Sequence, residues 1–132
     1  MDKILVTTHS HTEFVDITQE VDTLLKKQSV KEGICCLYVP HTTAAITINE
    51  NADPSVREDI INDLNRLVPW NGRYTHSEGN AAAHIKSTLV GSSASIPFTF
   101  GKLALGTWQG IYFCEFDGPR HREVFVQIIK NE

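Results

Sequence analysis

The hydrophobic residues near the start of the chain follow strand spacing, then helix spacing, then strand spacing again. The segments Lys3–His9 and Ile34–Val39 are rich in β-branched and apolar residues, which is typical of strands. Between them, Asp16 and Gln19 have the spacing of a helix capping box, and Gly33 follows the expected end of the helix. The predicted helix carries one apolar stripe toward the core, formed by Ile17, Val21, Leu24 and Leu25.

The middle of the chain predicts a strand over residues 44–49 and then two helices. Asp53 is a natural N-cap, and Pro54 suits the first position of a helix that Pro69 stops. Apolar residues recur along one face of this helix, at Val56, Ile60, Leu64 and Leu67. A shorter helix is predicted over Ala81–Leu89.

The last third of the chain predicts strands over residues 93–100, 106–116 and 123–131. The turn residues Asp117–Arg120 predict that the last two strands form a hairpin. Strands at both ends with helices between them favour an antiparallel or mixed sheet covered by about three helices over a doubly wound parallel fold. We therefore predict a single α+β domain over residues 1–132. The runs ICCLYV and IYFCEF hold so few charges that both faces of their sheet should be covered, in part by a second subunit.

Composition and charge narrow the classes of partner. Hydrophobic residues at 41% and charged residues at 21% are ordinary for a globular protein. A net charge of −4 gives no broad attraction to nucleic acid, so we expect none as a partner. No apolar run is long enough for a signal peptide or a membrane span, so we expect a cytoplasmic protein without a membrane partner. Three cysteines without a C-x-x-C pair predict neither a disulfide framework nor a thiolate zinc site.

Three of the histidines fall near the predicted ends of regular elements, where sites are commonly built. His41 follows a strand, His76 lies in a loop and His84 lies on the short helix. Three neutral imidazoles can hold zinc and leave one position open for chemistry. The spacing of His76 and His84 is not a strong motif by itself, so the alternative of histidines satisfied by hydrogen bonds stays open.

Polar residues close to these histidines could orient ligands or bind substrate. Glu78 and Asp53 are candidate catalytic carboxylates, although Asp53 is more typical of a helix N-cap and Glu78 also suits a solvated loop. Asn49 and Asn51 could form turns or hydrogen-bond a substrate. In the stretch GTWQG, glycines allow close approach of a ligand, and Gln109 is a candidate substrate-binding residue. The basic cluster over residues 120–122 could bind phosphate, but it is more typical of a surface turn.

Three stretches resemble a known family in the same order along the chain. They are HTTAAITINENADPSV, AHIKSTLVGSS and GKLALGTWQGIYFCEFDGPR, and they are similar to the YjbQ-type family, also called the secondary thiamine-phosphate synthase family. The resemblance implies a compact α+β fold that assembles as a homotrimer, with the site near subunit contacts. It also implies a metal site, usually taken as zinc, at His41, His76 and His84.

The activity that this resemblance implies is thiamine-phosphate synthesis. A hydroxymethylpyrimidine diphosphate would be coupled to a thiazole phosphate, with release of diphosphate. Because magnesium and carboxylates normally handle diphosphate, a zinc-dependent hydrolase or lyase of a small phosphorylated or carboxylated metabolite is the first alternative, with Glu78 or Asp53 as base. A trimeric metal-binding or metabolite-binding protein without turnover is the second alternative.

Overall fold

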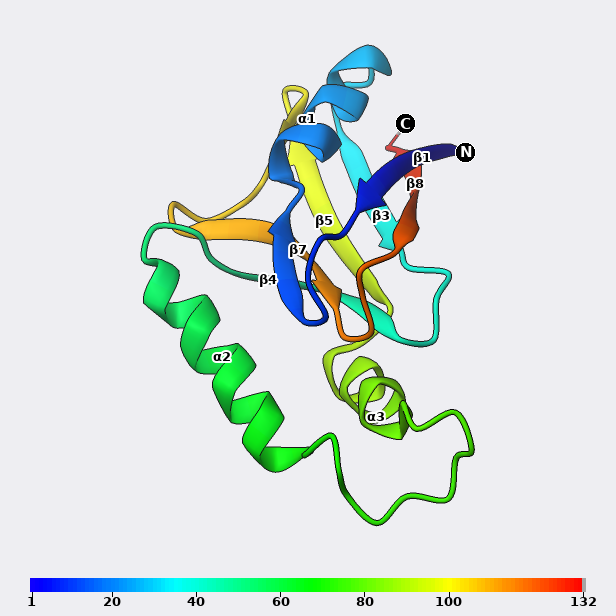
Figure 1. Ribbon diagram of the computed structural model, residues 1–132. Helices are drawn as coiled ribbons and strands as arrows, with labels where there is room; N and C mark the ends of the chain where they lie inside the picture. Colours follow the sequence, from blue (N-terminus) through cyan, green and yellow to red (C-terminus); the bar gives the residue numbers. More distant parts are fainter. Residues whose placement is uncertain (132) are drawn as a thin grey trace.

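The strands of the protein form two antiparallel sheets. The structure, a computed structural model, describes residues 1–131. The order of the five-stranded sheet is β1 (Asp2–Thr7), β8 (His121–Lys130), β3 (Gly33–Tyr38), β5 (Ser93–Thr99) and β6 (Lys102–Leu103). The order of the three-stranded sheet is β2 (Glu13–Asp16), β7 (Gln109–Glu115) and β4 (Ala44–Glu50). The helices are α1 (Thr18–Lys27), α2 (Pro54–Leu67) and α3 (Ala81–Val90), which confirms the predicted α+β class (Figure 1).

The main hydrophobic core lies between the two sheets and is closed at one end by α1. Leu37 and Val126 of the larger sheet pack in one cluster with Ile111 and Phe113 of β7. Val21 and Leu25 of α1 are buried in the same core, as the apolar stripe of this helix predicts. The capping box does not form, because Ile17 is the N-cap and Asp16 accepts hydrogen bonds from Thr18 instead.

A second, smaller cluster joins α3 to the other face of the three-stranded sheet. Ala83 of α3 packs with Ala45 of β4 and with Cys114 and Phe116 at the end of β7. Strand β7 is therefore covered on both faces, as its nearly uncharged sequence predicts.

Helix α2 projects away from the sheets (Figure 1). Its ends agree with the prediction, because Asp53 caps it and Pro54 occupies its first turn. None of its residues is buried: Leu64 of its apolar stripe packs half-buried against the smaller cluster, and Leu67 is 60% exposed. Within residues 1–131, none of the helices has the length and apolar character needed to cross a bilayer.

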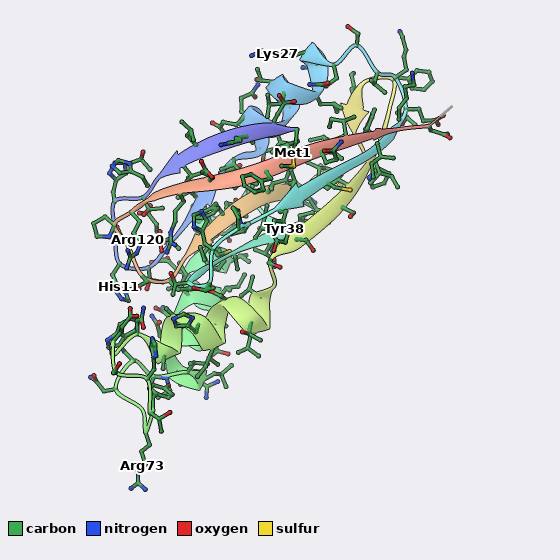
Figure 2. All side chains as sticks on the ribbon, turned by 90° about the vertical axis from the view of Figure 1, so that its right-hand side faces the viewer. Met1, His11, Lys27, Tyr38, Arg73 and Arg120 are labelled. Atoms are coloured by element: carbon green, nitrogen blue, oxygen red, sulfur yellow. The ribbon has the colours of Figure 1, made fainter. Side chains whose placement is uncertain are left out.

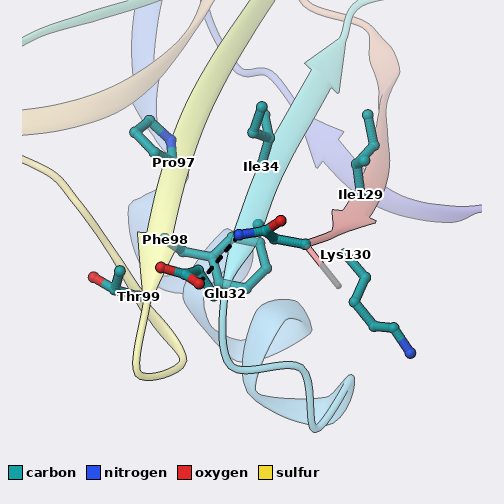
Figure 3. A pocket seen from close by; sticks show the side chains of 9 residues that line it. Glu32, Ile34, Pro97, Phe98, Thr99, Ile129 and Lys130 are labelled. Carbon is teal, nitrogen blue, oxygen red and sulfur yellow. Dashed lines mark hydrogen bonds between the residues drawn. The ribbon is translucent and has the colours of Figure 1, made fainter.

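The outer face of the five-stranded sheet carries a row of apolar side chains. Ile34 of β3 lies between Ile129 of β8 and Pro97 of β5 in the strand register (Figure 3). Tyr38 stacks on its cross-strand neighbour Phe125, with ring centres 6.5 Å apart. Tyr38 and Ile129 are each 51% exposed, so this apolar face is not covered within one chain.

The predicted hairpin between the last two strands is wrong. Strand β7 pairs with β2 and β4, whereas β8 pairs with β1 and β3. The backbone around the connecting turn bonds to the β1–β2 connection: Thr8 N–H donates to Arg120 O, and Gly118 N–H donates to His11 O. Arg120 N–H donates to the Thr8 hydroxyl. These bonds lead the chain from one sheet into the other.

Candidate functional site

A surface cavity lies between the β3–β4 connection and α3, and two of the predicted histidines line it. Its volume is about 440 Å³, and His41 and His84 contribute side chains to it. Ser87 and Thr88 on α3 and Ser92 before β5 add hydroxyl groups to the wall. A volume of this size suits a small molecule.

His76 lies beside His84 at this site. The ring centres of the two histidines are 5.2 Å apart, and the ring planes are at 84°. His76 is held in the loop before α3, and its Nε2 is 3.8 Å from Glu78 Oε1. Both side chains are exposed, so this contact contributes little to stability.

His41 is held in one orientation by the neighbouring strand. Its Nε2 accepts a hydrogen bond from the Glu123 N–H of β8 at 2.9 Å. Burial and then the nearby positive charge of Arg122 lower the pKa of His41, and the bond from Glu123 requires an unprotonated Nε2. His41 is therefore a neutral ring with its proton on Nδ1, and Nε2 is occupied.

The described residues fit a metal in part. Within residues 1–131, no group of three histidine, cysteine, aspartate or glutamate side chains converges as a metal site requires. His76 and His84 are close enough to share one ion, but His41 would have to release the Glu123 N–H or be joined by another group. The structure thus brings the three predicted ligands to one region without assembling them.

A buried ion pair supports the cavity from behind. Glu115 at the end of β7 is 0% exposed, and Arg122 of β8 is 5% exposed. Arg122 donates to both carboxylate oxygens of Glu115 at 2.8 and 2.5 Å, and also to the Thr43 hydroxyl at 2.9 Å. Thr43 follows His41 by two residues, so this pair positions the loop that carries His41.

Burial by itself would raise the pKa of Glu115, but hydrogen bonds outweigh it. Arg122, the Asp117 N–H and the Thr8 hydroxyl all donate to this carboxylate, and they hold its pKa below the usual range. Arg122 Nε and Nη2 are occupied by Glu115 and Thr43, and Arg120 binds Asp117 at 3.1 Å. Both arginines of the basic cluster over residues 120–122 are therefore paired with carboxylates of the chain.

The start of α3 is tied to the same region. Asn80 Nδ2 donates to Asp117 Oδ2 at 2.9 Å, which connects the helix carrying His84 to the turn between β7 and β8. Asn80 Oδ1 is buried and has no hydrogen-bond donor among residues 1–131. One acceptor thus remains available at the start of α3. His11 and Arg120 lie at this same end of the molecule (Figure 2).

The other predicted site residues lie at the opposite end of β4. His41 precedes β4, whereas Asn49 and Asn51 lie at or beyond its end, and a strand of seven residues spans about 20 Å. Gln109 is the register partner of Glu50 at this far end. One chain therefore does not bring these amides to the histidine cavity.

The side chains at the far end of β4 have structural partners within the chain. Gln109 Oε1 accepts the Gly106 N–H at 2.8 Å, and Asn49 Oδ1 accepts the Glu50 N–H at 2.7 Å. Asp53 accepts the Ser55 N–H at 2.9 Å, and hydrogen bonding from Ser55 lowers the pKa of Asp53. Asp53 is thus the N-cap of α2 in this chain.

The sequence contains signals for three buried charges, at Lys86, Glu115 and Arg122. Glu115 and Arg122 each interrupt a hydrophobic strand, and a charge at such a position must find a partner. Lys86 lies one turn after Ala82 and Ala83 on the buried face of α3, and it is 2% exposed.

A family profile and similar sequences from other organisms all point to the same protein family. The sequence profile of the family described as "UPF0047 protein YjbQ-like" matches residues 2–131. The UPF0047 protein MJ1081 of Methanocaldococcus jannaschii is 58% identical over 127 residues, covering 96% of this chain and 92% of that protein. The UPF0047 protein YugU of Bacillus subtilis is 47% identical over 125 residues, covering 94% of this chain and 95% of the relative.

Solved structures have the same fold. The crystal structure of an uncharacterised conserved protein of the YjbQ/UPF0047 family from Clostridium acetobutylicum matches with a TM-score of 0.96 and 51% identity, covering 98% of this chain and 100% of the other. That of the hypothetical protein APE1520 from Aeropyrum pernix matches with a TM-score of 0.94 and 38% identity, covering 98% of each chain.

Proposed function

Since this chain belongs to the YjbQ-like UPF0047 family, we propose that its histidine cavity binds one divalent metal ion, preferably zinc, and a small phosphorylated substrate beside it. The observation that carries the proposal is the distance of 5.2 Å between the His76 and His84 ring centres. Two imidazoles bound to one tetrahedral zinc at about 2.1 Å would have ring centres about 5 Å apart. The observed pair needs little rearrangement to satisfy this geometry.

His41 is the proposed third ligand, and its neutral state is the form that a metal requires. Glu78, next to His76, would orient that ring through a hydrogen bond and serve as the base of the site. The hydroxyl groups of Thr42 and Ser92 line the same cavity and would donate to phosphate oxygens. Those of Ser87 and Thr88 already donate to the Ala83 and His84 carbonyls of α3. When bound, the ion would neutralise negative charge that develops on a leaving group.

The reaction proposed first is the coupling of a hydroxymethylpyrimidine diphosphate to a thiazole phosphate with release of diphosphate. In this reaction the chain holds two phosphorylated substrates and shields them from water. The second candidate is hydrolysis or elimination of a small phosphorylated or carboxylated metabolite. The all-histidine donor set favours this second candidate, because histidine suits zinc and magnesium-bound diphosphate prefers carboxylates. A binding protein without turnover is the third candidate.

We further propose that the chain acts as a homotrimer. Two different apolar surfaces are incompletely covered: the outer face of the five-stranded sheet and the stripe of α2, where Leu67 is exposed and Val56, Ile60 and Leu64 are half-buried. They lie on different sides of the molecule (Figure 1), so contact between them would be head-to-tail and could close into a ring. His41 is bonded to Glu123 at one end of the sheet face, so the ring would bring a neighbouring copy close to the cavity. Asp53, Asn51 and Gln109 would then reach the site from that neighbour.

Metal content tests the proposed centre. We expect about one divalent ion per chain in the purified protein and at least tenfold weaker metal affinity in His84→Ala and His76→Ala. His121→Ala is the matched control, because His121 is exposed and lies outside the cavity, with a hydrogen bond to Thr7. Full metal occupancy in His84→Ala would refute the metal site.

Product analysis separates the candidate reactions. Diphosphate released only when both phosphorylated substrates are present indicates the transferase, whereas product from one substrate and water indicates the hydrolase. Binding without any product supports the third candidate. Mixed assembly tests the shared site: if His84→Ala and Gln109→Ala are each inactive, co-assembled subunits should regain part of the activity. No recovery from a confirmed mixed trimer would refute a shared site.

A further inference from the structure

Lys86 is a buried positive charge without a negative partner. It lies on α3, two residues from His84 and on the other side of the helix, and its side chain is 2% exposed. Its ammonium donates to the neutral Asn65 Oδ1 of α2 and lies 5.9 Å from the centre of the Phe116 ring. Within residues 1–131, Lys86 forms no salt bridge.

Lys86 lines a cavity distinct from the one that carries the histidines. This cavity has a volume of about 420 Å³ and is lined by His11, Thr12, Asn65, Trp70 and Lys86. Trp70 provides a large apolar wall, and His11 packs against it edge-on with ring centres 4.4 Å apart. The cavity therefore combines one buried cation, a few polar groups and an aromatic surface, as small-molecule sites commonly do.

The chain itself compensates the Lys86 charge poorly. An amide oxygen and an aromatic face stabilise an ammonium far less than a carboxylate does, so burial of this charge costs stability. Asn65 is exposed, so it could bond to water equally well if Lys86 were absent. A lysine that served only to attach α2 would not need to be buried next to an open cavity.

We propose that this cavity binds a small organic carboxylate, with its oxygens on Lys86 and its apolar body against Trp70. A single buried cation matches a single negative charge. Asp117 Oδ1 lies 4.0 Å from His11 Nε2, so a second negative charge is already near the cavity. The Asp117 carboxylate disfavours a doubly charged phosphate in the cavity, because the two negative groups would repel each other.

Titration with benzoate tests the site in the full-length protein. Calorimetry should show binding, and the indole N–H signal of Trp70 should shift in a ¹H–¹⁵N spectrum, with its assignment taken from Trp70→Phe. Lys86→Met should weaken benzoate at least about tenfold, because a hydrogen bond to a charged group is lost. Lys102→Met, which removes an exposed lysine, is the matched control for net charge and should leave the affinity unchanged.

Unfolding experiments distinguish a binding lysine from a structural one. Lys86→Met should unfold at the same or a higher urea concentration than the parent protein, because it removes an uncompensated buried charge. A clear loss of stability in Lys86→Met would mean that Lys86 is structural and would overturn the proposal. Equal affinity for benzyl alcohol, or binding of inorganic phosphate but not of benzoate, would overturn it as well.

Discussion

Replacing Glu115 by glutamine should strongly destabilise the protein, although the two side chains have almost the same shape. Glu115 is completely buried, and its two oxygens accept four hydrogen bonds. An amide in its place keeps only one acceptor oxygen. Its NH₂ group would then face other donors, such as Arg122 Nη2 and the Asp117 N–H. The guanidinium of Arg122 would also be left buried without a compensating charge.

Removing one partner of a buried ion pair costs about 3–5 kcal/mol. At about 2.1 cal/mol/K per residue, the 132 residues have an unfolding entropy of about 0.28 kcal/mol/K. A loss of about 4 kcal/mol would thus lower Tm by about 14 °C. The matched control is Glu123→Gln, which breaks the exposed pair of Glu123 with Lys3 (3.5 Å) and should cost less than about 1 kcal/mol.

Urea denaturation of both variants measures these free energies. The double variant Glu115→Gln/Arg122→Met should lose less stability than the two single variants added together, because it leaves no unpaired charge. A loss below about 1 kcal/mol for Glu115→Gln, or strictly additive effects in the double variant, would refute the ion-pair argument.

Three further predictions concern stability. Gly33→Ala should lose about 1–3 kcal/mol in urea denaturation, because a Cβ at this position would lie 2.0 Å from the Ile129 carbonyl oxygen; parent-like stability would contradict this. Asp53→Ala should cost about 1 kcal/mol through loss of the α2 cap and leave metal content unchanged; loss of metal would instead support a direct role for Asp53. The low pKa of Glu115 contributes stability that is present above its unfolded pKa of about 4.5 and is lost as pH falls through the lower folded value. Between neutral and acidic pH, the free energy of unfolding of Glu115→Gln should therefore fall less than that of the parent. If it falls equally with pH in both proteins, Glu115 is not the group responsible.

Capping residues, prolines and apolar spacing predicted where helices and strands lie better than they predicted what those elements pack against or pair with. The cap at Asp53, the proline at position 54 and the helical spacing of apolar residues act within α2 itself, so its ends could be read from the sequence. Whether its apolar stripe meets the core depends on the rest of the chain, and none of α2 is buried. Likewise, the turn before Arg120 is visible in the sequence, but sheet membership is decided by backbone bonds to residues 8 and 11.

The same limit applies to the candidate site. The element ends that carry His41, His76 and His84 lie close together, as the shared cavity and the ring contact place them, but the role proposed for these residues stays a prediction. Spacing could not show that the Glu123 N–H occupies His41, since these residues are far apart in the sequence. It also could not show that Gln109 lies at the far end of β4, because this position depends on strand register.

The place of β8 between β1 and β3 has a consequence for biosynthesis. Residue 2 pairs with residue 126, so β1 leaves the ribosome long before its partner strand exists. β3 pairs with β5 on one side, but its other side also waits for β8. The nascent chain must therefore carry unpaired strand edges through most of its synthesis, and such edges are prone to aggregation. Any stop or truncation before residue 121 would leave these edges permanently open, so we expect such fragments to depend on chaperones or to be degraded.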